Sequence, residues 1–378
     1  MLITLDDLRW FTVARNFFQP TSLKRALQRV GFVQADPIRA PARAQDLILR
    51  HRVKNYHAGD LERRYATLDI EEDVFVTYGF VTRDLRALMH PRTEARVGWG
   101  KGKKGKREIS RTQLLLEFVR ERGAVHPREV DEHFSHGTVK NYWGGSSNAT
   151  THLLDEMHYR GLLRVARREK GIRLYTAHQH EAGLTDTGES QARIDALVDA
   201  VVRIYAPLPG PSLSFYGRRL RYAVPQWREE LTGALQRAKE RLAHTQVDGV
   251  EWYWPAEDVI IHGGAATEGR HYKLPDDIVR LLAPFDPLVH DRARFELLWG
   301  WEYRFEAYTP AAKRKFGYYA LPLLWRDRVI GWANLSVKNG ELKSEFGYVT
   351  SQRPRDRAFK RELEAELFRM STFLRLES

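Results

Sequence analysis

The chain has 378 residues, with 61 Lys and Arg against 49 Asp and Glu, so its formal net charge is +12. The absence of cysteine excludes disulfides, iron–sulfur clusters, thiolate zinc sites and cysteine nucleophiles. The sequence contains no run of about 18 apolar residues, so no membrane span is predicted. Acidic residues also occur too early for a secretory signal, and we therefore expect a cytoplasmic protein. Its positive charge favours a polyanion such as nucleic acid as the partner.

The first expected unit, residues 1–100, reads as helical with one short extended insertion. Apolar residues recur with helical spacing, Thr21 or Ser22 can cap the second helix, and Pro41 suits the first turn of the third. The helices are expected at 5–15, 21–31 and 42–52, and the extended segment at 32–36.

A glycine- and lysine-rich segment follows at residues 100–107. Its three glycines predict a flexible loop, and its five cations can contact phosphate. A solvated linker without a partner is the alternative. The cations expected to contact DNA are Lys101, Lys103, Lys104, Lys106 and Arg107.

Residues 108–180 predict a winged helix-turn-helix. Helices are expected at 112–121, shortly before Phe134 and at 147–157. Apolar runs then flank the charged tip Lys170–Gly171, which indicates a β-hairpin. Three helices followed by a basic hairpin are typical of a winged helix, although many winged helices contact protein and not DNA.

A third unit over residues 185–262 repeats part of this pattern. Helices are expected at 190–206 and 227–242, and residues 247–250 resemble the tip of another wing. We therefore expect variants of one module in tandem, without an exact internal repeat.

The last unit, residues 275–378, is expected to be β-rich and antiparallel, which makes the fold class α+β. Aromatic and β-branched runs predict its strands, and a charged amphipathic helix is expected at 356–368. The strands are expected at 303–308, 318–324, 329–333 and 342–346.

A basic run with an aromatic residue falls between two of these strands and predicts a hairpin tip. Its cations can neutralise phosphates, and an inserted hairpin can probe the minor groove. A solvated turn is the alternative. The residues expected to contact DNA here are Lys313, Arg314, Lys315 and Phe316.

Gln34 and Asp36 are the strongest candidates for chemistry. In an extended segment they point to one side while Ala35 points away, and Pro37 keeps Asp36 out of the helical region. An amide beside a carboxylate can hold a water, and the carboxylate can take a proton or face a developing cation. The alternative is an Asp-Pro turn in which Asp36 only caps local N–H groups.

Three blocks of the sequence together resemble the AlkZ/YcaQ-type DNA glycosylases. The blocks are 31–38 with 43–52, 282–289 with 291–294, and 308–322. The resemblance implies tandem winged helices around a C-shaped DNA-binding groove, with a β-rich C-terminal domain. It also implies excision of N-alkylated purines and, in some members, unhooking of interstrand crosslinks. The family motif of Gln, an aliphatic residue and then Asp or Gln matches Gln34 and Asp36, which are thereby expected to be the catalytic pair.

Two positions depart from the family pattern. Ala35 is smaller than the usual aliphatic residue of the motif, and Tyr78, Gly79 and Phe80 lie where a segment with Trp and His is more common. These departures fit a side branch with its own lesion preference.

The chemistry of an alkylated purine suits this pair. Alkylation at N7 leaves the base cationic, so it departs without an acid, and the sugar that remains needs negative charge and a water. Asp36 would stabilise the sugar cation and activate the water, and Gln34 would position it.

We therefore expect a monofunctional glycosylase that needs no metal or cofactor. Its expected substrate is double-stranded DNA with alkylated purines, and we expect a monomer associated with a bacterial nucleoid. The alternatives are a non-catalytic winged-helix DNA-binding protein or regulator, and a basic scaffold associated with nucleic acid.

Overall fold

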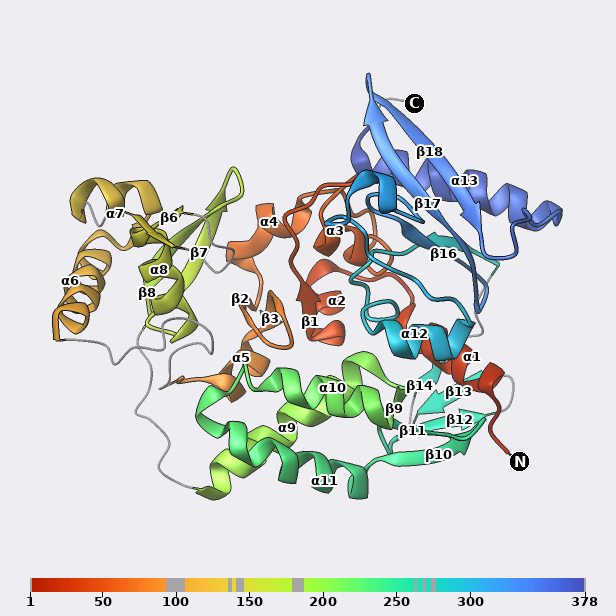
Figure 1. Ribbon diagram of the computed structural model, residues 1–378, viewed down its shortest axis with the longest axis horizontal. Helices are drawn as coiled ribbons and strands as arrows, with labels where there is room; N and C mark the ends of the chain where they lie inside the picture. Colours follow the sequence, from red (N-terminus) through yellow and green to blue (C-terminus); the bar gives the residue numbers. More distant parts are fainter. Residues whose placement is uncertain are drawn as a thin grey trace. The chain divides into compact units, whose positions relative to one another are not determined.

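The protein, seen in a computed structural model, contains helices and sheets in both of its compact units (Figure 1). The expected α+β class is confirmed. In the described parts of the chain, no helix is long and apolar enough to cross a membrane. Unit 1 comprises residues 1–61, 198–216 and 235–378, and unit 2 comprises residues 62–197 and 217–234. The structure describes residues 2–92, 106–134, 138–140, 146–178, 187–261, 264–267, 270–272 and 277–376.

One order of elements recurs along the described chain: a helix, a strand, two helices and a two-stranded hairpin, apart from short insertions. The first series is α2 (Leu23–Val30), β1 (Phe32–Gln34), α3 (Ala44–Leu49), α4 (Asp60–Arg64), β2 (Ile70–Val74) and β3 (Tyr78–Thr82). The second is α6 (Lys106–Arg122), β4 (Ala124–Val125), α7 (Pro127–Phe134), α8 (Ala149–Tyr159), β7 (Leu163–Glu169) and β8 (Ile172–Ala177). The third is α9 (Thr187–Tyr205), β9 (Leu208–Pro209), α10 (Gly210–Leu220), α11 (Leu231–Arg241), β10 (Ala243–Val247) and β11 (Val250–Trp254).

The expected N-terminal helices are present, with local caps that explain their bounds. In α1 (Leu5–Asn16), Thr4 and Asp7 form a reciprocal capping box. Ser22 caps α2, and Gly31 ends it at a φ of 75°, a conformation that glycine adopts without strain. The third helix, α3, is shorter than expected, because Pro41 lies in a bend before it and the helix begins only at Ala44.

The first hundred residues also contain an antiparallel hairpin, β2 with β3, that the sequence did not predict. All five residues of β2 are buried, although Glu72 and Asp73 are acidic. Each carboxylate is paired: Asp73 accepts bonds from Arg92 and His90, both at 2.7 Å, and Glu72 accepts one from Arg168 Nε at 2.7 Å. An acidic strand lacks the apolar alternation that marks a strand in sequence, and here ion pairing replaces it.

The helices and hairpin expected in residues 108–180 are present. The hairpin β7–β8 turns at Lys170 and Gly171, both at positive φ, and β4 pairs with β8 to give the sheet order β4-β8-β7. Residues 146–148 form β6 (Ser146–Asn148), which pairs with β5 (Thr138–Lys140), so α8 begins two residues later than expected.

In the third series, α9 and the wing are present as expected, whereas α10 was missed. The helix expected over 227–242 is interrupted, because residues 225–230 form a 3-10 turn (η2) with non-helical backbone at Trp227, and α11 follows it. The wing turns at Asp248 and Gly249, both at positive φ. The Gly-Pro start of α10 conceals a buried apolar stripe of Leu213, Tyr216 and Leu220.

The C-terminal part carries a four-stranded antiparallel sheet with α13 (Arg357–Leu374) beside it (Figure 1). The sheet order is β15 (Val279–Leu281), β16 (Leu321–Trp325), β17 (Arg328–Lys338) and β18 (Glu341–Tyr348). The expected strand at 303–308 is wrong: these residues form loops and turns after α12 (Arg292–Trp299), which was not expected. The remaining elements are η1 (Tyr65–Thr67), α5 (Arg83–Met89), β12 (Asp258–Ile261), β13 (Gly264–Thr267), β14 (Arg270–Tyr272) and η3 (Ala311–Lys313).

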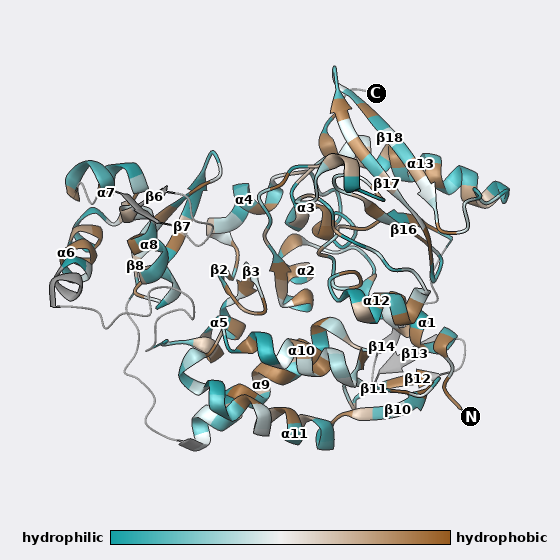
Figure 2. Cartoon of the chain, in the orientation of Figure 1, coloured by the Kyte–Doolittle hydropathy of each residue, from teal (hydrophilic) through white to brown (hydrophobic). Residues whose placement is uncertain are grey.

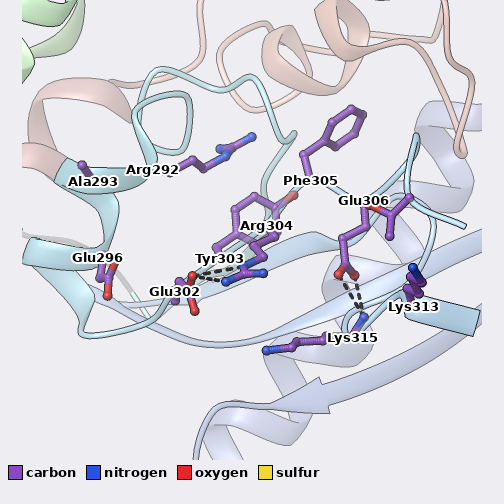
Figure 3. Close-up of a pocket in the computed structure, with 11 residues that line it drawn as sticks. Arg292, Ala293, Glu296, Glu302, Tyr303, Arg304, Phe305, Glu306, Lys313 and Lys315 are labelled. Atoms are coloured by element: carbon purple, nitrogen blue, oxygen red, sulfur yellow. Dashed lines mark hydrogen bonds and ion pairs between the residues drawn. The ribbon is translucent and has the colours of Figure 1, made fainter.

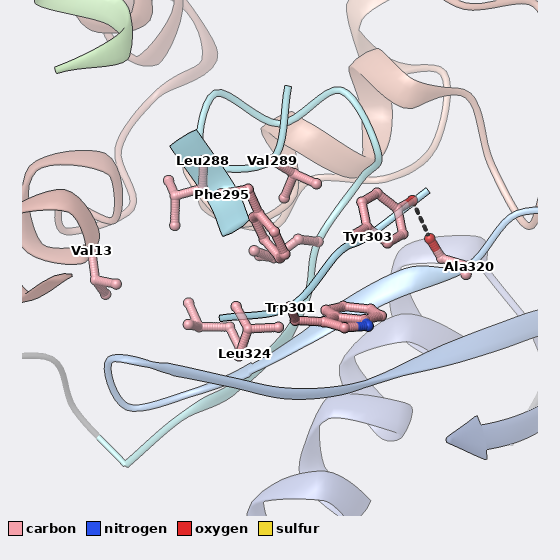
Figure 4. Packing of buried hydrophobic residues seen from close by; sticks show 10 residues of the cluster. Val13, Leu288, Val289, Phe295, Trp301, Tyr303, Ala320 and Leu324 are labelled. Carbon is pink, nitrogen blue, oxygen red and sulfur yellow. Dashed lines mark hydrogen bonds between the residues drawn. The ribbon is translucent and has the colours of Figure 1, made fainter. Parts of the chain in front are cut away.

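Aromatic packing explains why this loop region is apolar without being a strand. Trp301 stacks on Trp332 at 5.5 Å, and Phe295 packs against Trp301 at 5.8 Å. The Tyr303 hydroxyl donates to the Ala320 carbonyl at 2.7 Å (Figure 4). The aromatic side chains of this loop region therefore fill a buried cluster, and their burial does not require the backbone to form a strand. Figure 2 shows that β1, in the same unit, is largely apolar; its first two residues, Phe32 and Val33, are buried.

Candidate active site

Asp36 lies two residues after the end of β1, so this strand is shorter than the extended segment expected over 32–36, and the residue is 9% exposed. Its carboxylate Oδ1 accepts the Ile38 N–H at 2.9 Å, and its own N–H donates to Gln45 Oε1 at 3.3 Å. The local turn considered as the alternative is therefore present. A carboxylate has room for about four acceptor contacts, so this cap does not exhaust it. Gln34 is the last residue of β1 and is half-buried.

Burial raises the pKa of Asp36 above its ordinary value, and the hydrogen bond from the Ile38 N–H opposes this shift only in part. A carboxylate with a raised pKa is a stronger base than an exposed one. It can therefore take a proton from a water more readily, and its charge is less shielded by solvent.

Two tyrosines from a distant part of the chain lie within the electric field of Asp36. Burial is the main reason that the pKa values of Tyr308 and Tyr319 are raised, and the Asp36 charge is the next cause for both. Their rings each contact Phe305, at 6.0 Å and 5.4 Å between ring centroids. Tyr308 is 80% exposed, whereas Tyr319 is 2% exposed. The Asp36 charge thus acts on one tyrosine at the surface and on one that is buried.

A buried ion pair joins the two sequence regions that meet here. Arg52 follows α3 and donates from Nη1 and Nη2 to the two carboxylate oxygens of Asp286, at 2.8 and 3.1 Å. The two residues are 1% and 0% exposed. Because such a bidentate pair tolerates little displacement, it holds the segment after β1 in register with the loop that precedes α12.

A cavity of about 710 Å³ opens in the same unit (Figure 3). Cations and carboxylates both line it, and Arg304 pairs with Glu302 on its wall. Lys313 and Lys315 are exposed at its edge. The lining residues are Arg292, Ala293, Glu296, Glu302, Tyr303, Arg304, Phe305, Glu306, Thr309, Lys313 and Lys315.

The basic run at this cavity is not a hairpin tip as expected. Lys313 ends the short η3 turn and the rest of the run is a loop, which joins no adjacent pair of strands. The Glu306 carboxylate accepts the backbone N–H of Lys315 at 2.9 Å (Figure 3). It also accepts that of Phe316 at 2.7 Å, so a side chain satisfies donors that a strand ladder would otherwise pair. The Arg314 Nε donates to the Thr309 carbonyl at 2.7 Å.

Phe316 packs into the protein. Its ring lies 5.2 Å from Trp301 and 4.9 Å from Trp332, centroid to centroid. Its carbonyl also accepts a bond from Asn334 Nδ2 at 2.6 Å. The aromatic residue of this loop therefore anchors it, and Lys313 and Lys315 are the side chains that it presents to solvent.

The other cations expected to contact DNA fall partly outside the described residues. Lys101, Lys103 and Lys104 lie in the segment that the structure does not describe. Lys106 and Arg107 are the first residues of α6, so the expected loop over 100–107 is wrong at its end. Within the described ranges, no group of three or more His, Asp or Glu side chains is arranged to hold a metal ion.

Sequence reasoning named Asp36 as a candidate and gave no role to Tyr308 and Tyr319, the two tyrosines on which its charge acts. Tyr308 and Tyr319 lie in the third block of the resemblance, but no local pattern marked them as site residues. Their only signal was an aromatic-rich run, which is equally typical of a core strand.

A family model described as DNA glycosylase AlkZ-like matches residues 27–373, nearly the whole chain. The matched range contains the motif after α2, the Arg52–Asp286 pair and both tyrosines. No solved structure matches the chain.

Proposed function

We propose that this chain, which belongs to the AlkZ-like DNA glycosylase family and hydrolyses N-glycosidic bonds in DNA, removes purines alkylated at N7. The observation that carries this proposal is Asp36: a carboxylate in a residue that is 9% exposed, with a pKa that burial raises, inside the range that the family model matches. A cationic base needs no acid to help it leave, so one carboxylate and one water are sufficient.

In the proposed reaction, Asp36 faces the sugar carbon from which the base departs. The bond between C1′ and N9 breaks, and its electron pair neutralises the cationic purine. A water oxygen bonds to C1′ and passes a proton to the Asp36 carboxylate. Gln34, the last residue of β1, orients this water through its amide. The product is an abasic site with an intact strand, because no amine forms a covalent adduct.

DNA engagement is proposed through the cations around the same cavity. Lys313 and Lys315 are exposed beside it, and a phosphate there would lie near Arg304 as well. Lys101, Lys103, Lys104, Lys106 and Arg107 are proposed as further phosphate contacts. Arg314 supports the loop through its bond to Thr309 and contributes positive charge.

The wider architecture belongs to the same proposal. The recurring order of helix, strand, two helices and hairpin is the order expected for tandem winged helices, and we propose that a monomer uses them to line a C-shaped groove for duplex DNA of the nucleoid. We propose that the site opens at the surface where Tyr308 is 80% exposed. A base still tethered to the opposite strand could reach it, so we include interstrand crosslinks among the substrates.

The test is release of N7-methylguanine from methylated duplex DNA. The variant Asp36→Asn should lose about 10²- to 10³-fold in rate while it still binds the duplex. Asp277→Asn, at an exposed carboxylate that pairs with Arg326, should be fully active. Freed base is measured by chromatography, and abasic sites by strand cleavage in alkali. Full activity of Asp36→Asn would show that Asp36 is not the catalytic carboxylate. A wild-type protein that binds the duplex but frees no base would support the non-catalytic alternative.

A further inference from the structure

Two exposed tyrosines flank the basic loop. Tyr308 is 80% exposed and Tyr318 is 44% exposed. Among the Phe, Tyr and Trp residues that the structure describes, only Phe368, on α13, is exposed as well. A single exposed aromatic residue is ordinary on a protein surface, whereas a group of them marks a binding site more often.

Arg314 connects the two tyrosines. Its guanidinium lies over the Tyr318 ring, 5.1 Å from the ring centroid. Its Nε donates at 2.7 Å to the carbonyl of Thr309, the residue that follows Tyr308. Three flat groups, two phenol rings and one guanidinium, are therefore held close together at the surface. We call Tyr308, Arg314 and Tyr318 the aromatic patch.

The backbone around Tyr308 is ordered by local hydrogen bonds although its side chain is in solvent. The Thr309 N–H donates to the Glu306 carbonyl at 3.0 Å, and the Lys313 N–H donates to the Pro310 carbonyl at 2.9 Å. The Tyr308 ring itself touches Phe305 edge-on, at 6.0 Å between centroids. A surface that is already ordered loses little conformational entropy when a ligand binds to it.

The cations beside the patch indicate the class of ligand. Phe305 lines the cavity described above together with Lys313 and Lys315, and both lysines are exposed (Figure 3). Flat aromatic groups next to exposed cations are typical of surfaces that bind unpaired nucleotides, because the rings stack on bases while the cations neutralise phosphates.

We propose that the aromatic patch stacks on an unpaired nucleobase of the bound DNA, with the Tyr308 ring as the main contact. This inference rests on the proposed engagement of DNA by the basic loop. Inside a duplex both faces of a base are covered by its neighbours, so only a base that has left the stack offers a face to the patch. A base leaves at least cost where its pairing is already disturbed, so the patch favours distorted DNA over intact duplex.

The test compares two duplexes that differ by one bulged adenine. The wild type should bind the bulged duplex more tightly than the fully paired one, in a fluorescence anisotropy titration at fixed salt. Tyr308→Ala should lose about 5- to 150-fold in affinity for the bulged duplex, as expected for one lost stacking contact. Its affinity for the paired duplex should stay that of the wild type. Tyr308→Phe should keep the preference because it keeps the ring.

Two controls separate the ring from other surface effects. Phe368→Ala removes an exposed aromatic residue outside the basic loop and should bind both duplexes as the wild type does. Lys313→Ala with Lys315→Ala should weaken binding of both duplexes by the same factor and lower the salt dependence, whereas Tyr308→Ala should keep the wild-type salt dependence.

A fluorescent base reports the stacking itself. With 2-aminopurine in place of the bulged adenine, the wild type should quench the fluorescence and Tyr308→Ala should not, because a stacked ring quenches this base. Wild-type affinity and quenching by Tyr308→Ala, or an equal loss of affinity for both duplexes, would overturn the inference.

Release of N7-methylguanine is measured on the same proteins. If the wild type frees no base but Tyr308→Ala still loses the preference for the bulge, the proposed function fails and the aromatic patch stands. If the wild type frees the base and Tyr308→Ala binds both duplexes as the wild type does, only the inference about the patch fails.

Discussion

At the scale of single residues, Asp36 links stability to activity. Its pKa is raised by burial from the ordinary value of 3.8, so the folded protein binds this proton more tightly than the unfolded chain does. The free energy of unfolding therefore decreases as pH rises from about 3.8 through the raised pKa. Asp36→Asn should remove the unfavourable burial of the charged carboxylate, while the amide oxygen of the new side chain still accepts the Ile38 N–H. We expect the free energy of unfolding of this variant to exceed that of the wild type at pH 7, measured by denaturant unfolding.

The pH dependence makes this prediction specific. The gain should shrink as the pH is lowered towards about 4, where the unfolded chain also begins to hold the proton. Asp277→Asn, at an exposed carboxylate, provides the comparison. If Asp36→Asn is less stable than the wild type at neutral pH, contacts in the folded protein stabilise the charged carboxylate by more than burial destabilises it, and the prediction is wrong.

At the scale of elements, one buried carboxylate shapes the basic loop. Glu306 is 5% exposed, and it accepts backbone N–H groups of Lys315 and Phe316. Hydrogen bonds to a charged group contribute about 1.5–3 kcal/mol each, so Glu306→Ala should destabilise this part of the fold by about 2–3 kcal/mol. It should also weaken DNA binding although it leaves every cation in place.

Glu302→Ala is the matched control for Glu306→Ala, because both residues line the same cavity. Glu302 is an exposed carboxylate that pairs with Arg304, and Glu302→Ala should leave stability unchanged because a solvent-exposed pair is well screened. Chemical unfolding and a duplex binding assay check both variants. Equal binding by Glu306→Ala and the wild type would show that the loop needs no fixed shape to engage DNA.

At the scale of the whole molecule, the net charge of +12 attracts DNA, but only local contacts release counterions. Lys313→Ala with Lys315→Ala should reduce the salt dependence of binding by about one in log–log slope for each lost phosphate contact. Lys338→Ala with Lys343→Ala removes the same charge from β17 and β18 and should leave the slope unchanged. Equal slopes for the two double variants would assign the effect of charge to the long-range field alone.

The features that the sequence predicted correctly are those set by residues close together in the chain. The Ser22 cap and Gly31 end of α2, and the turns at Lys170–Gly171 and Asp248–Gly249, were predicted because each depends on the backbone needs of a few neighbouring residues. Amphipathic spacing likewise predicted α1 and α9. The catalytic role of Gln34 and Asp36 stays a prediction; the strand expected over 32–36 ends at Gln34, and Asp36 lies in the turn that follows.

Where partners are distant in sequence, local patterns were insufficient. The acidic strand β2 is buried only because Arg92 and Arg168 neutralise it, and the Glu306 carboxylate replaces the hairpin that a basic run suggested. Tyr319 meets the field of Asp36 because the chain folds back on itself there. Caps and turns are decided by nearby backbone, whereas burial, pairing and the partners of a carboxylate exist only once remote segments have packed together.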